Sequence, residues 1–598
     1  MRNSSDIPVQ SYAVTVAEVI PGDLLALSEE EVAADRWYVV MHTVPETPYT
    51  IRVTLRPPLG GIDHDEVFDR GHRVTVACRR VDVGGIPHLV SADLESVEFR
   101  EGDRVTFLRA VNPRAVEESY TRRWGQWHRD LEGPVQERAE ERVDDVELRR
   151  RGVAAVGEGD VVRHHPRPRP VGEARVVGPR RVVVTGLGAV TPLGVGVGEL
   201  WQGLVDGRCG IRELEGEEFA ELPVRVAGSV PVDPLGLLPR PQARRMNRAA
   251  QFAVLAAREA WQDAGFDVAG TAESGLDPDR VGVSVGAILG DASVLVGGDR
   301  KLRDKGPRAV SPLTTPMTVP SQAASQVSLA LHITGEARTV TSACASGTEA
   351  IGQAIDRIRY GHVDVALAGG AEAVVTPAIM ASFAAMRALS THGLEADGSA
   401  SPSRPFAGDR DGFVNGEGAG LLVLEAEEHA RARGARIYCE AAGWGLSADA
   451  HHMAAPDPSG RGVALALRRA VRDAGGHVVD VVHVNAHATA TVDGDLAEAS
   501  AVRAVLGRGV PVTALKGHLG HLQGAAGGVE AVATVLTLHH GLIPPTLGCE
   551  HQDDAIDLDV VTEAPRPLPA LGDLALSNSF GFGGHNAVLA LRRIGKSA

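Results

Sequence analysis

From Arg181 onward, short apolar runs alternate with longer stretches of helical periodicity, and this alternation constrains the fold more than any other feature. Runs such as Val182–Val184 and Val281–Val285 are rich in β-branched or apolar residues, as strands buried on both faces are. The stretch Asn247–Gly265 has helical spacing and ends in a glycine stop signal. Strands that alternate with helices over about 400 residues predict a layered α/β domain with largely buried strands.

The first 180 residues have a different composition. Residues 1–112 contain short runs that alternate or are apolar between Gly, Pro and Asp turns, such as Thr50–Leu55 and Arg73–Cys78, and this spacing predicts a small β-rich, barrel-like domain. Residues 113–180 are first charged and then rich in Pro, Arg and Gly, so a charged helix followed by a linker is expected. The role of these 180 residues stays open between a docking module, a brace for a dimer and an independent binding domain.

Composition argues against several classes of protein. The 598 residues carry a net charge of −17, whereas nucleic-acid binding generally requires a basic face. The five cysteines are scattered without a CxxC pair, so neither a disulfide framework nor a metal site is indicated. No apolar run approaches the ~18 residues of a membrane span, and the N-terminus has no signal-peptide pattern. A cytoplasmic protein without membrane contact is therefore the expectation.

Cys344 lies in the segment Thr341–Thr348, between a predicted buried strand and a predicted helix. Free cysteines are usually inert buried residues, and this arrangement alone is only moderately specific. The start of a helix, however, offers unsatisfied N–H groups and a positive dipole end that favour a thiolate. The neighbouring side chains are small, so a substrate could approach. Cys344 is therefore a candidate nucleophile.

Two stretches further along the chain place histidines in turns. His487 follows a predicted strand and precedes Glu498, while Lys516 and His521 lie in a glycine-rich turn before an apolar helix. One histidine alone would be interpreted as a structural or surface residue. Together with the cysteine and the glycine-rich segment Ser577–Asn586, the set predicts one shared catalytic site.

These residues in combination resemble the β-ketoacyl-acyl carrier protein synthases, or ketosynthases, of the thiolase superfamily. The resemblance covers about residues 181–593. It implies a five-layered αβαβα fold made of two similar halves, about 181–430 and 431–598, that is normally a dimer. The partner would be a second copy or a ketosynthase-like chain-length partner. Further matching stretches are Pro320–Ser325, Ser403–Phe406 and Asp409–Gly420.

The resemblance also implies a role for each candidate residue. Cys344 matches the acyl-accepting nucleophile of the elongating Cys-His-His type. His487 and His521 match the pair that assists decarboxylation of the extender and stabilises the enolate. Lys516 and Glu498 match a pair that orients these histidines. No bound cofactor and no metal are implied.

Two further features belong to the same comparison. The backbone N–H groups of Cys344 and Phe582 match the oxyanion hole, and Phe582 also matches the gating phenylalanine beside the cysteine. The glycine that usually follows the first histidine is replaced by Ala488. If that position needs positive φ, the added Cβ strains the loop; otherwise one methyl group narrows the pocket.

The substrates are expected to arrive on a partner protein. The chain shows no acyltransferase, reductase or carrier-protein motif, so acyl and malonyl groups would be held on the phosphopantetheine arm of a separate acyl carrier protein, which is typically acidic. Arg244, Arg245 and Arg308 resemble the carrier-docking positions of the family. An ordinary solvated helix start is the alternative interpretation.

The sequence therefore predicts a β-ketoacyl synthase that catalyses decarboxylative Claisen condensation. The additional β-rich domain favours a type II polyketide or specialised fatty-acid pathway over housekeeping fatty-acid elongation, which stays open. A non-catalytic chain-length factor characteristically lacks the cysteine, so Cys344 and the two histidines argue against it. A degradative thiolase would carry a second cysteine in Ser577–Asn586, and enzymes that start fatty-acid synthesis have Asn where His521 stands here.

Overall fold

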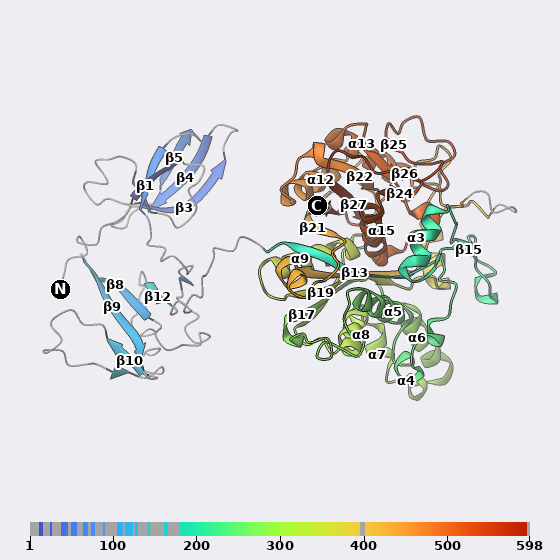
Figure 1. The fold of residues 1–598 in the computed structure, drawn as a ribbon, viewed down its shortest axis with the longest axis horizontal. Coiled ribbons are helices and arrows are strands. Elements are labelled where there is room, and N and C mark those ends of the chain that lie inside the picture. Colours follow the sequence, from blue (N-terminus) through green and yellow to red (C-terminus); the bar gives the residue numbers. More distant parts are fainter. Residues whose placement is uncertain are drawn as a thin grey trace. The chain divides into compact units, whose positions relative to one another are not determined.

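The structure is a computed structural model that describes residues 180–394 and 401–594, together with the backbone of short strands before residue 180 (Figure 1). The chain divides into two compact units, Met1–Val176 and Val177–Ala598. The division falls inside the stretch that is rich in Pro, Arg and Gly. Each unit is described by itself below.

The first unit contains two antiparallel sheets. Four of its strands lie within residues 113–180, so the charged helix expected there is not found at these positions. The strand Arg114–Arg123 pairs along its length with Arg104–Val111, and this ladder of backbone bonds outweighs the helical propensity of the charged residues. The rest of the expected helix and linker lies largely outside the described residues. The first sheet comprises β1 (Ser11–Thr15), β6 (Arg73–Ala77), β2 (Leu24–Ala26), β3 (Tyr38–Pro45), β4 (Thr50–Arg56) and β5 (His64–Asp69); the second comprises β11 (Arg142–Val143), β10 (Gln126–Arg129), β9 (Arg114–Arg123), β8 (Arg104–Val111), β12 (Val161–His165) and β7 (His88–Leu89).

The second unit is built from two sheet halves with the same strand order. In each half the first three strands are parallel and the last two are antiparallel to their neighbours. The N-half comprises, in order, β18 (Glu336–Val340), β17 (Val281–Gly286), β19 (Val365–Glu372), β20 (Gly418–Ala426) and β13 (Val182–Thr191); the corresponding strands of the C-half are β23 (Pro511–Thr513), β22 (Val481–Asn485), β27 (Leu574–Gly581), β28 (His585–Arg593) and β21 (Cys439–Ala448). One more short strand, β25 (Asp559–Val560), pairs parallel to β23 at the edge of the C-half. The halves join through β13 and β21, where Val183 lies opposite Glu440 and Val184 lies opposite Cys439.

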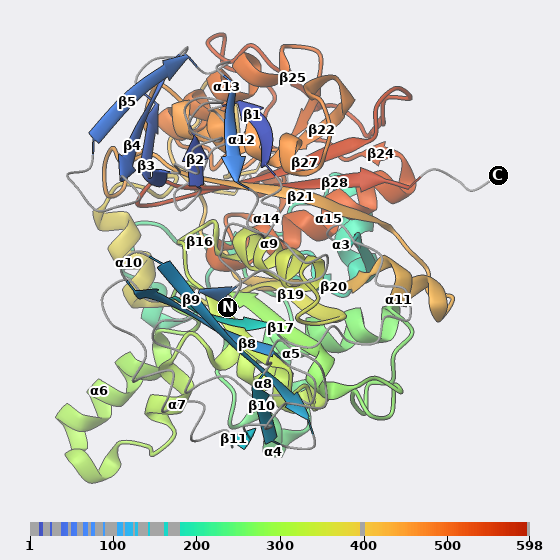
Figure 2. The same ribbon diagram turned by 90° about the vertical axis from the view of Figure 1, so that its left-hand side faces the viewer.

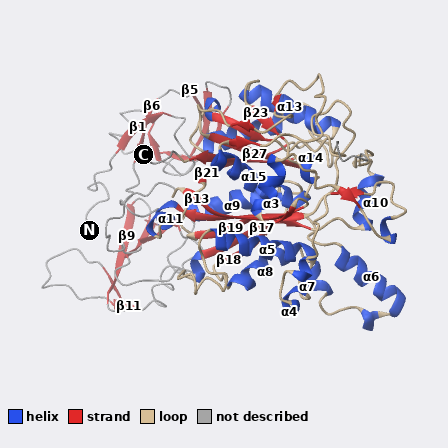
Figure 3. Cartoon of the chain, turned by 45° about the vertical axis from the view of Figure 1, so that its right-hand side comes forward, coloured by secondary structure: helices blue, strands red, loops and turns tan. Residues whose placement is uncertain are grey.

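Helices form three layers around the two sheets, which confirms the αβαβα fold. Helices α5 and α8 pack on the outer face of the N-half sheet. Helix α12 packs on the outer face of the C-half sheet, and α13 packs against α12. Figure 3 shows α9 and α15 between the two sheets, and Figure 2 shows the same arrangement from another side. The helices are α5 (Arg248–Asp263), α8 (Gln322–Leu331), α12 (Arg461–Asp473), α13 (Val492–Leu506), α9 (Ser346–Arg359) and α15 (Ala526–His540).

The sequence explains why these helices occupy different layers. Residues 526–538 of α15 are all buried, because a helix that is apolar on every side is stable only inside the protein. In α12, by contrast, the buried residues lie on one face, and arginines occupy the other. Close packing of the central layer requires glycine: a Cβ added at Gly420 on β20 would lie 2.4 Å from the backbone nitrogen of Val529 on α15.

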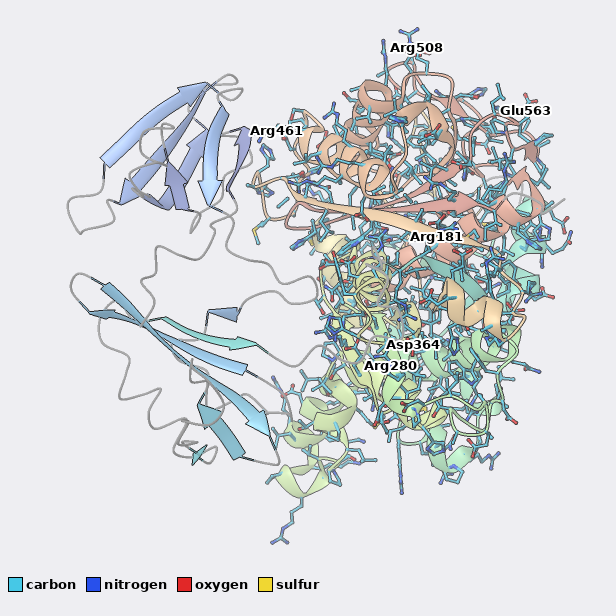
Figure 4. All side chains as sticks on the ribbon, turned by 60° about the vertical axis from the view of Figure 1, so that its left-hand side comes forward. Arg181, Arg280, Asp364, Arg461, Arg508 and Glu563 are labelled. Carbon is cyan, nitrogen blue, oxygen red and sulfur yellow. The ribbon has the colours of Figure 1, made fainter. Side chains whose placement is uncertain are left out.

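Ion pairs tie the ends of the strands together. Arg181, at the start of β13, donates to Glu440 on β21 at 2.7 and 3.1 Å, at the junction of the two halves. Arg280 donates to Asp364 at 2.7 and 2.9 Å, which joins the starts of β17 and β19 (Figure 4).

No described helix is both long enough and apolar enough to cross a membrane. Further α-helices of the second unit are α3 (Val197–Val205), α4 (Arg240–Ala243), α6 (Ser293–Lys305), α7 (Thr314–Thr318), α10 (Pro377–Ala385), α11 (Glu427–Ala432) and α14 (Lys516–Leu519).

Candidate active site

Cys344 lies in the turn between β18 and α9, as the sequence predicted. The preceding residue, Ala343, has φ 51°, a left-handed conformation that costs a non-glycine residue about 1 kcal/mol. Ser346 stabilises this turn, because its Oγ accepts the Ser342 N–H at 2.9 Å and donates to the Ala343 carbonyl at 2.5 Å. Cys344 is 6% exposed. The turn therefore holds a buried thiol at the start of the central helix.

The thiol of Cys344 is protonated at rest. Burial raises its pKa to about 12, although the charge of Lys516 and the backbone N–H groups of Phe582 and of Cys344 itself act in the opposite direction. The N–H groups at the helix start thus lower the pKa of this thiol, as expected, but desolvation raises it by more. The two N–H groups near the sulfur are the pair that the sequence assigned to an oxyanion hole.

His487 and His521 meet the cysteine from the other half of the domain. The imidazole centroids are 5.3 Å apart with the rings nearly perpendicular. One ring nitrogen from each histidine and the Cys344 sulfur lie within 4.8 Å of one another. These are also donor types that bind metals, and they form the one such group of three within the described part of the chain. The positive charge of Lys516, which lowers the pKa of both histidines, would also repel a metal cation.

Both imidazoles are neutral. Burial first, and the nearby charge of Lys516 second, hold the pKa of His487 and that of His521 well below the usual value. The backbone N–H of Gln523 donates to Nδ1 of His521 at 3.3 Å, so the imidazole proton lies on Nε2. Nε2 of His521 and Nδ1 of His487 have no hydrogen-bond partner among the described residues. His521 can therefore donate a hydrogen bond to a ligand without first losing another partner.

Two carboxylates support the histidines, and the sequence identified only one of them. Lys516 pairs with Glu530 on α15 at 2.5 Å, with both side chains buried. Glu498 instead accepts the backbone N–H groups of His487 at 2.9 Å and Ala488 at 2.7 Å. Lys516 and Glu498 therefore act through different partners: Lys516 forms its ion pair with Glu530, and Glu498 holds the backbone of the His487 loop. Glu530 could have been found in the sequence, because it is the single carboxylate in the otherwise apolar helix that follows Lys516.

The strained position in the His487 loop is Ala490 rather than Ala488. Ala490 has φ 65°, whereas Ala488 is outside the left-handed region. Asp495 stabilises the strained turn by accepting the Ala490 N–H at 3.1 Å. Ala488 lines the cavity in front of the cysteine. Its methyl group thus narrows the cavity and does not strain the backbone.

A cavity of about 400 Å³ connects the three reactive groups to the surface. Its walls include Ala488 and the loop between β27 and β28, which carries Phe582. Phe582 is 38% exposed, and the next residue, Gly583, donates to the Met453 carbonyl at 2.9 Å. The partly exposed Phe582 and the buried thiol of Cys344 thus line the same cavity.

Comparisons with known proteins agree with this geometry. The family model described as "Beta-ketoacyl synthase, N-terminal domain" matches residues 179–430, and the model for the C-terminal domain of the same family matches residues 438–550. The chain belongs to the β-ketoacyl synthase family. It is therefore an acyltransferase of the 3-oxoacyl-[acyl-carrier-protein] synthase type.

Relatives of this β-ketoacyl synthase cover its second unit. The "3-oxoacyl-[acyl-carrier-protein] synthase 2" of Synechocystis sp. is 41% identical over 418 residues, which are 69% of this chain and 98% of the relative. The protein of the same name from Vibrio cholerae is 39% identical over 420 residues, 69% of this chain and 99% of the relative.

Solved structures of ketosynthases have the same fold. "The ishigamide ketosynthase/chain length factor" is 36% identical with a TM-score of 0.64, covering 70% of this chain and all of the other. A ketosynthase bound to the hexaketide, in complex with its type II polyketide synthase acyl-carrier protein, is 34% identical with a TM-score of 0.63 and the same coverage.

Proposed function

We propose that this β-ketoacyl synthase joins an acyl group held on Cys344 to a malonyl group held on an acyl carrier protein, by decarboxylative Claisen condensation. The observation that carries the proposal is the meeting of one thiol and two neutral imidazoles within 4.8 Å in a single cavity. A nucleophile and two uncharged hydrogen-bond donors suit a reaction that needs an acyl acceptor and an enolate site.

In the first step, the sulfur of Cys344 attacks the carbonyl carbon of the incoming acyl thioester. The new S–C bond forms as the bond to the carrier thiol breaks, and the Cys344 proton leaves with the carrier thiol. A neutral histidine beside the sulfur can relay this proton. The backbone N–H groups of Cys344 and Phe582 stabilise the negative charge on the thioester oxygen.

In the second step, the malonyl group loses CO₂ and its electron pair becomes an enolate. The thioester oxygen of the enolate accepts hydrogen bonds from His487 and His521, whose unpartnered nitrogens are available for this purpose. The enolate carbon then attacks the acyl carbon on Cys344. The C–S bond to the cysteine breaks, the 3-oxoacyl chain leaves on the carrier, and the Cys344 thiolate takes up one proton from water to restore the thiol.

The carrier protein is proposed to dock on the basic surface of the N-half. Arg244, Arg245 and Arg308 are exposed, and among the described residues none of their guanidinium groups has a hydrogen-bond or ion-pair partner. Figure 1 shows α4, α6 and α7 together on the outer side of the N-half, where these arginines lie. An acidic carrier would complement this charge.

For the pathway, we propose type II polyketide or specialised fatty-acid synthesis. The chain spans almost the full length of its curated relatives and has about 180 residues more. The similar solved structures include a ketosynthase of a type II polyketide synthase and a ketosynthase/chain length factor. We further propose that residues 181–598 catalyse the reaction as a dimer, with a second copy or with a ketosynthase-like chain-length partner. Housekeeping elongation is the second candidate, because the names of the relatives favour it.

Incubation with malonyl-carrier protein and a panel of acyl-carrier proteins tests this proposal. Mass spectrometry is expected to show an acyl adduct on Cys344 and a 3-oxoacyl chain, two carbons longer, on the carrier. A protein that is acylated but never extends the chain in the presence of malonyl-carrier protein would contradict the condensing activity. The preferred chain length separates the two pathways.

A further inference from the structure

A buried amide faces the thiol of Cys344. Gln523, in the turn that follows His521, is 4% exposed and lines the cavity. Its Oε1 lies 3.7 Å from the Cys344 sulfur, a distance at which it accepts the S–H group. Its backbone φ of 52° is left-handed, and such strain in a non-glycine residue often marks a functional position.

A chain of hydrogen bonds fixes which end of this amide faces the cysteine. The carbonyl of Val374 can only accept, so the Asn415 atom that contacts it at 3.1 Å is the donor Nδ2. Oδ1 of Asn415 then faces Gln523 and accepts from its Nε2 at 3.0 Å. Because Nε2 is used in this way, Oε1 of Gln523 is held toward the sulfur. A flip of the Gln523 amide would place its oxygen against that of Asn415.

Acylation removes the partner of this oxygen. In the resting enzyme the Cys344 thiol is the one described group that donates to Oε1 of Gln523. When the thioester forms, the S–H proton leaves with the carrier thiol and a carbon takes its place on the sulfur. A saturated acyl chain offers no donor, so a buried acceptor is left unsatisfied, which is unfavourable. A chain with a hydroxyl or enol group near its carbonyl can donate instead.

We propose that Gln523 is a specificity-determining residue that selects acyl chains carrying a hydroxyl or enol group within a few bonds of the thioester. This inference rests on the proposed function, since it concerns the acyl group held on Cys344. In the acyl-enzyme, the hydroxyl or enol group of the acyl chain lies beside the amide of Gln523. It also predicts that fully saturated chains are the poorer substrates.

The test compares two thioesters that differ by one hydroxyl group, hexanoyl- and 3-hydroxyhexanoyl-carrier protein. The rate at which each acylates Cys344 in the full-length protein is followed by intact mass spectrometry. The wild type is expected to react about tenfold faster with the hydroxylated chain. In Gln523→Met, which keeps the side-chain length and loses the acceptor, this preference should fall to less than twofold. Gln353→Met, on α9 and away from the cavity, is the matched control and should keep it.

The possible failures are distinguishable. Equal rates for the two chains in the wild type would overturn the role of Gln523 and leave the condensing function intact, and this measurement needs no variant to fold. A preference that survives in a folded Gln523→Met protein would also overturn it. No acylation of Cys344 by either chain would contradict the proposed function itself.

Discussion

The two halves of the second unit have the same strand order and differ in the reactive side chains that they contribute. In each half, a buried carboxylate accepts backbone N–H groups of the loop that follows the second strand. Glu372 accepts three in the N-half, from Ile288 to Gly290, at 2.5 to 3.0 Å. Glu498 accepts two after β22 in the C-half. The repeated strand order therefore extends to the polar contacts that hold the loops.

The difference lies in the turns that lead from the first strand of each half, β18 or β23, into the central layer. After β18 the N-half presents the thiol of Cys344, and after β23 the C-half presents Lys516 and His521. The starts of the two central helices touch backbone to backbone: a Cβ added at Gly347 would lie 2.8 Å from the nitrogen of Gly528. The repeated strand order thus places two equivalent turns side by side, with the nucleophile in one and Lys516 and His521 in the other, while His487 lies in the loop after β22.

Removing the reactive group of the N-half has the largest expected effect. In Cys344→Ala, acyl transfer should fall by more than about 10³-fold, because the protein then has no sulfur at the site. Intact mass spectrometry after incubation with acyl-carrier protein measures the adduct. Cys209→Ala, which alters a cysteine outside the cavity, is the control and should be acylated normally. An adduct on the Cys344→Ala protein would refute the division of roles.

Breaking the buried ion pair of the C-half comes next. Lys516→Met leaves Glu530 buried without its partner, so the free energy of unfolding should fall by about 3–5 kcal/mol. Urea denaturation measures this change. In the double variant Lys516→Met/Glu530→Leu, no carboxylate is stranded and much of the stability should return. A single variant as stable as the wild type would show that the pair does not support the C-half turn.

The raised thiol pKa predicts an unusual pH dependence of alkylation. Because burial raises the pKa of Cys344 from 9.0 to about 12, its thiolate becomes abundant only near the upper value. The rate of reaction with iodoacetamide should keep rising beyond pH 10, where the rate for a small free thiol has levelled off. At pH 9 it should be roughly 500 times lower than the rate for that free thiol. A plateau below pH 9 would mean that the helix start, not burial, controls this thiol.

Charge reversal on the N-half surface should affect only carrier binding. Arg245→Glu is expected to raise the KM for acyl-carrier protein about fivefold, with a smaller effect at high salt and little change in kcat. Arg461→Glu, which changes another exposed arginine, on α12 of the C-half (Figure 4), is the control. Equal effects of the two variants would show that the carrier does not recognise the N-half specifically.

The smallest effect concerns the strained loop of the C-half. Ala490→Gly removes the Cβ from a left-handed residue and should stabilise the protein by about 1 kcal/mol. Ala488→Gly, two residues earlier, has no such strain to relieve and should be neutral or destabilising. Thermal unfolding of both variants measures the difference. If only Ala488→Gly made the protein more stable, the strained residue would be Ala488 and not Ala490.

The sequence predicts those parts of the site that motifs carry. The α/β alternation and the positions of Cys344, His487 and His521 follow from local patterns, because strand ends and helix starts are encoded locally. Glu530 and Gln523 were missed, since their contacts depend on how α15 and the turn before it pack against other elements. The protonated thiol was also missed, because local sequence shows the helix dipole but not the depth of burial.

The central claim is that one half accepts the acyl group and the other half activates the extender. The double variant His487→Ala/His521→Ala separates these two steps when it is incubated with acyl- and malonyl-carrier proteins. Mass spectrometry should show an acyl adduct on Cys344 while formation of the 3-oxoacyl chain falls by at least about 10²–10³-fold relative to the wild type. Chain extension at the wild-type rate by this acylated variant would contradict the account.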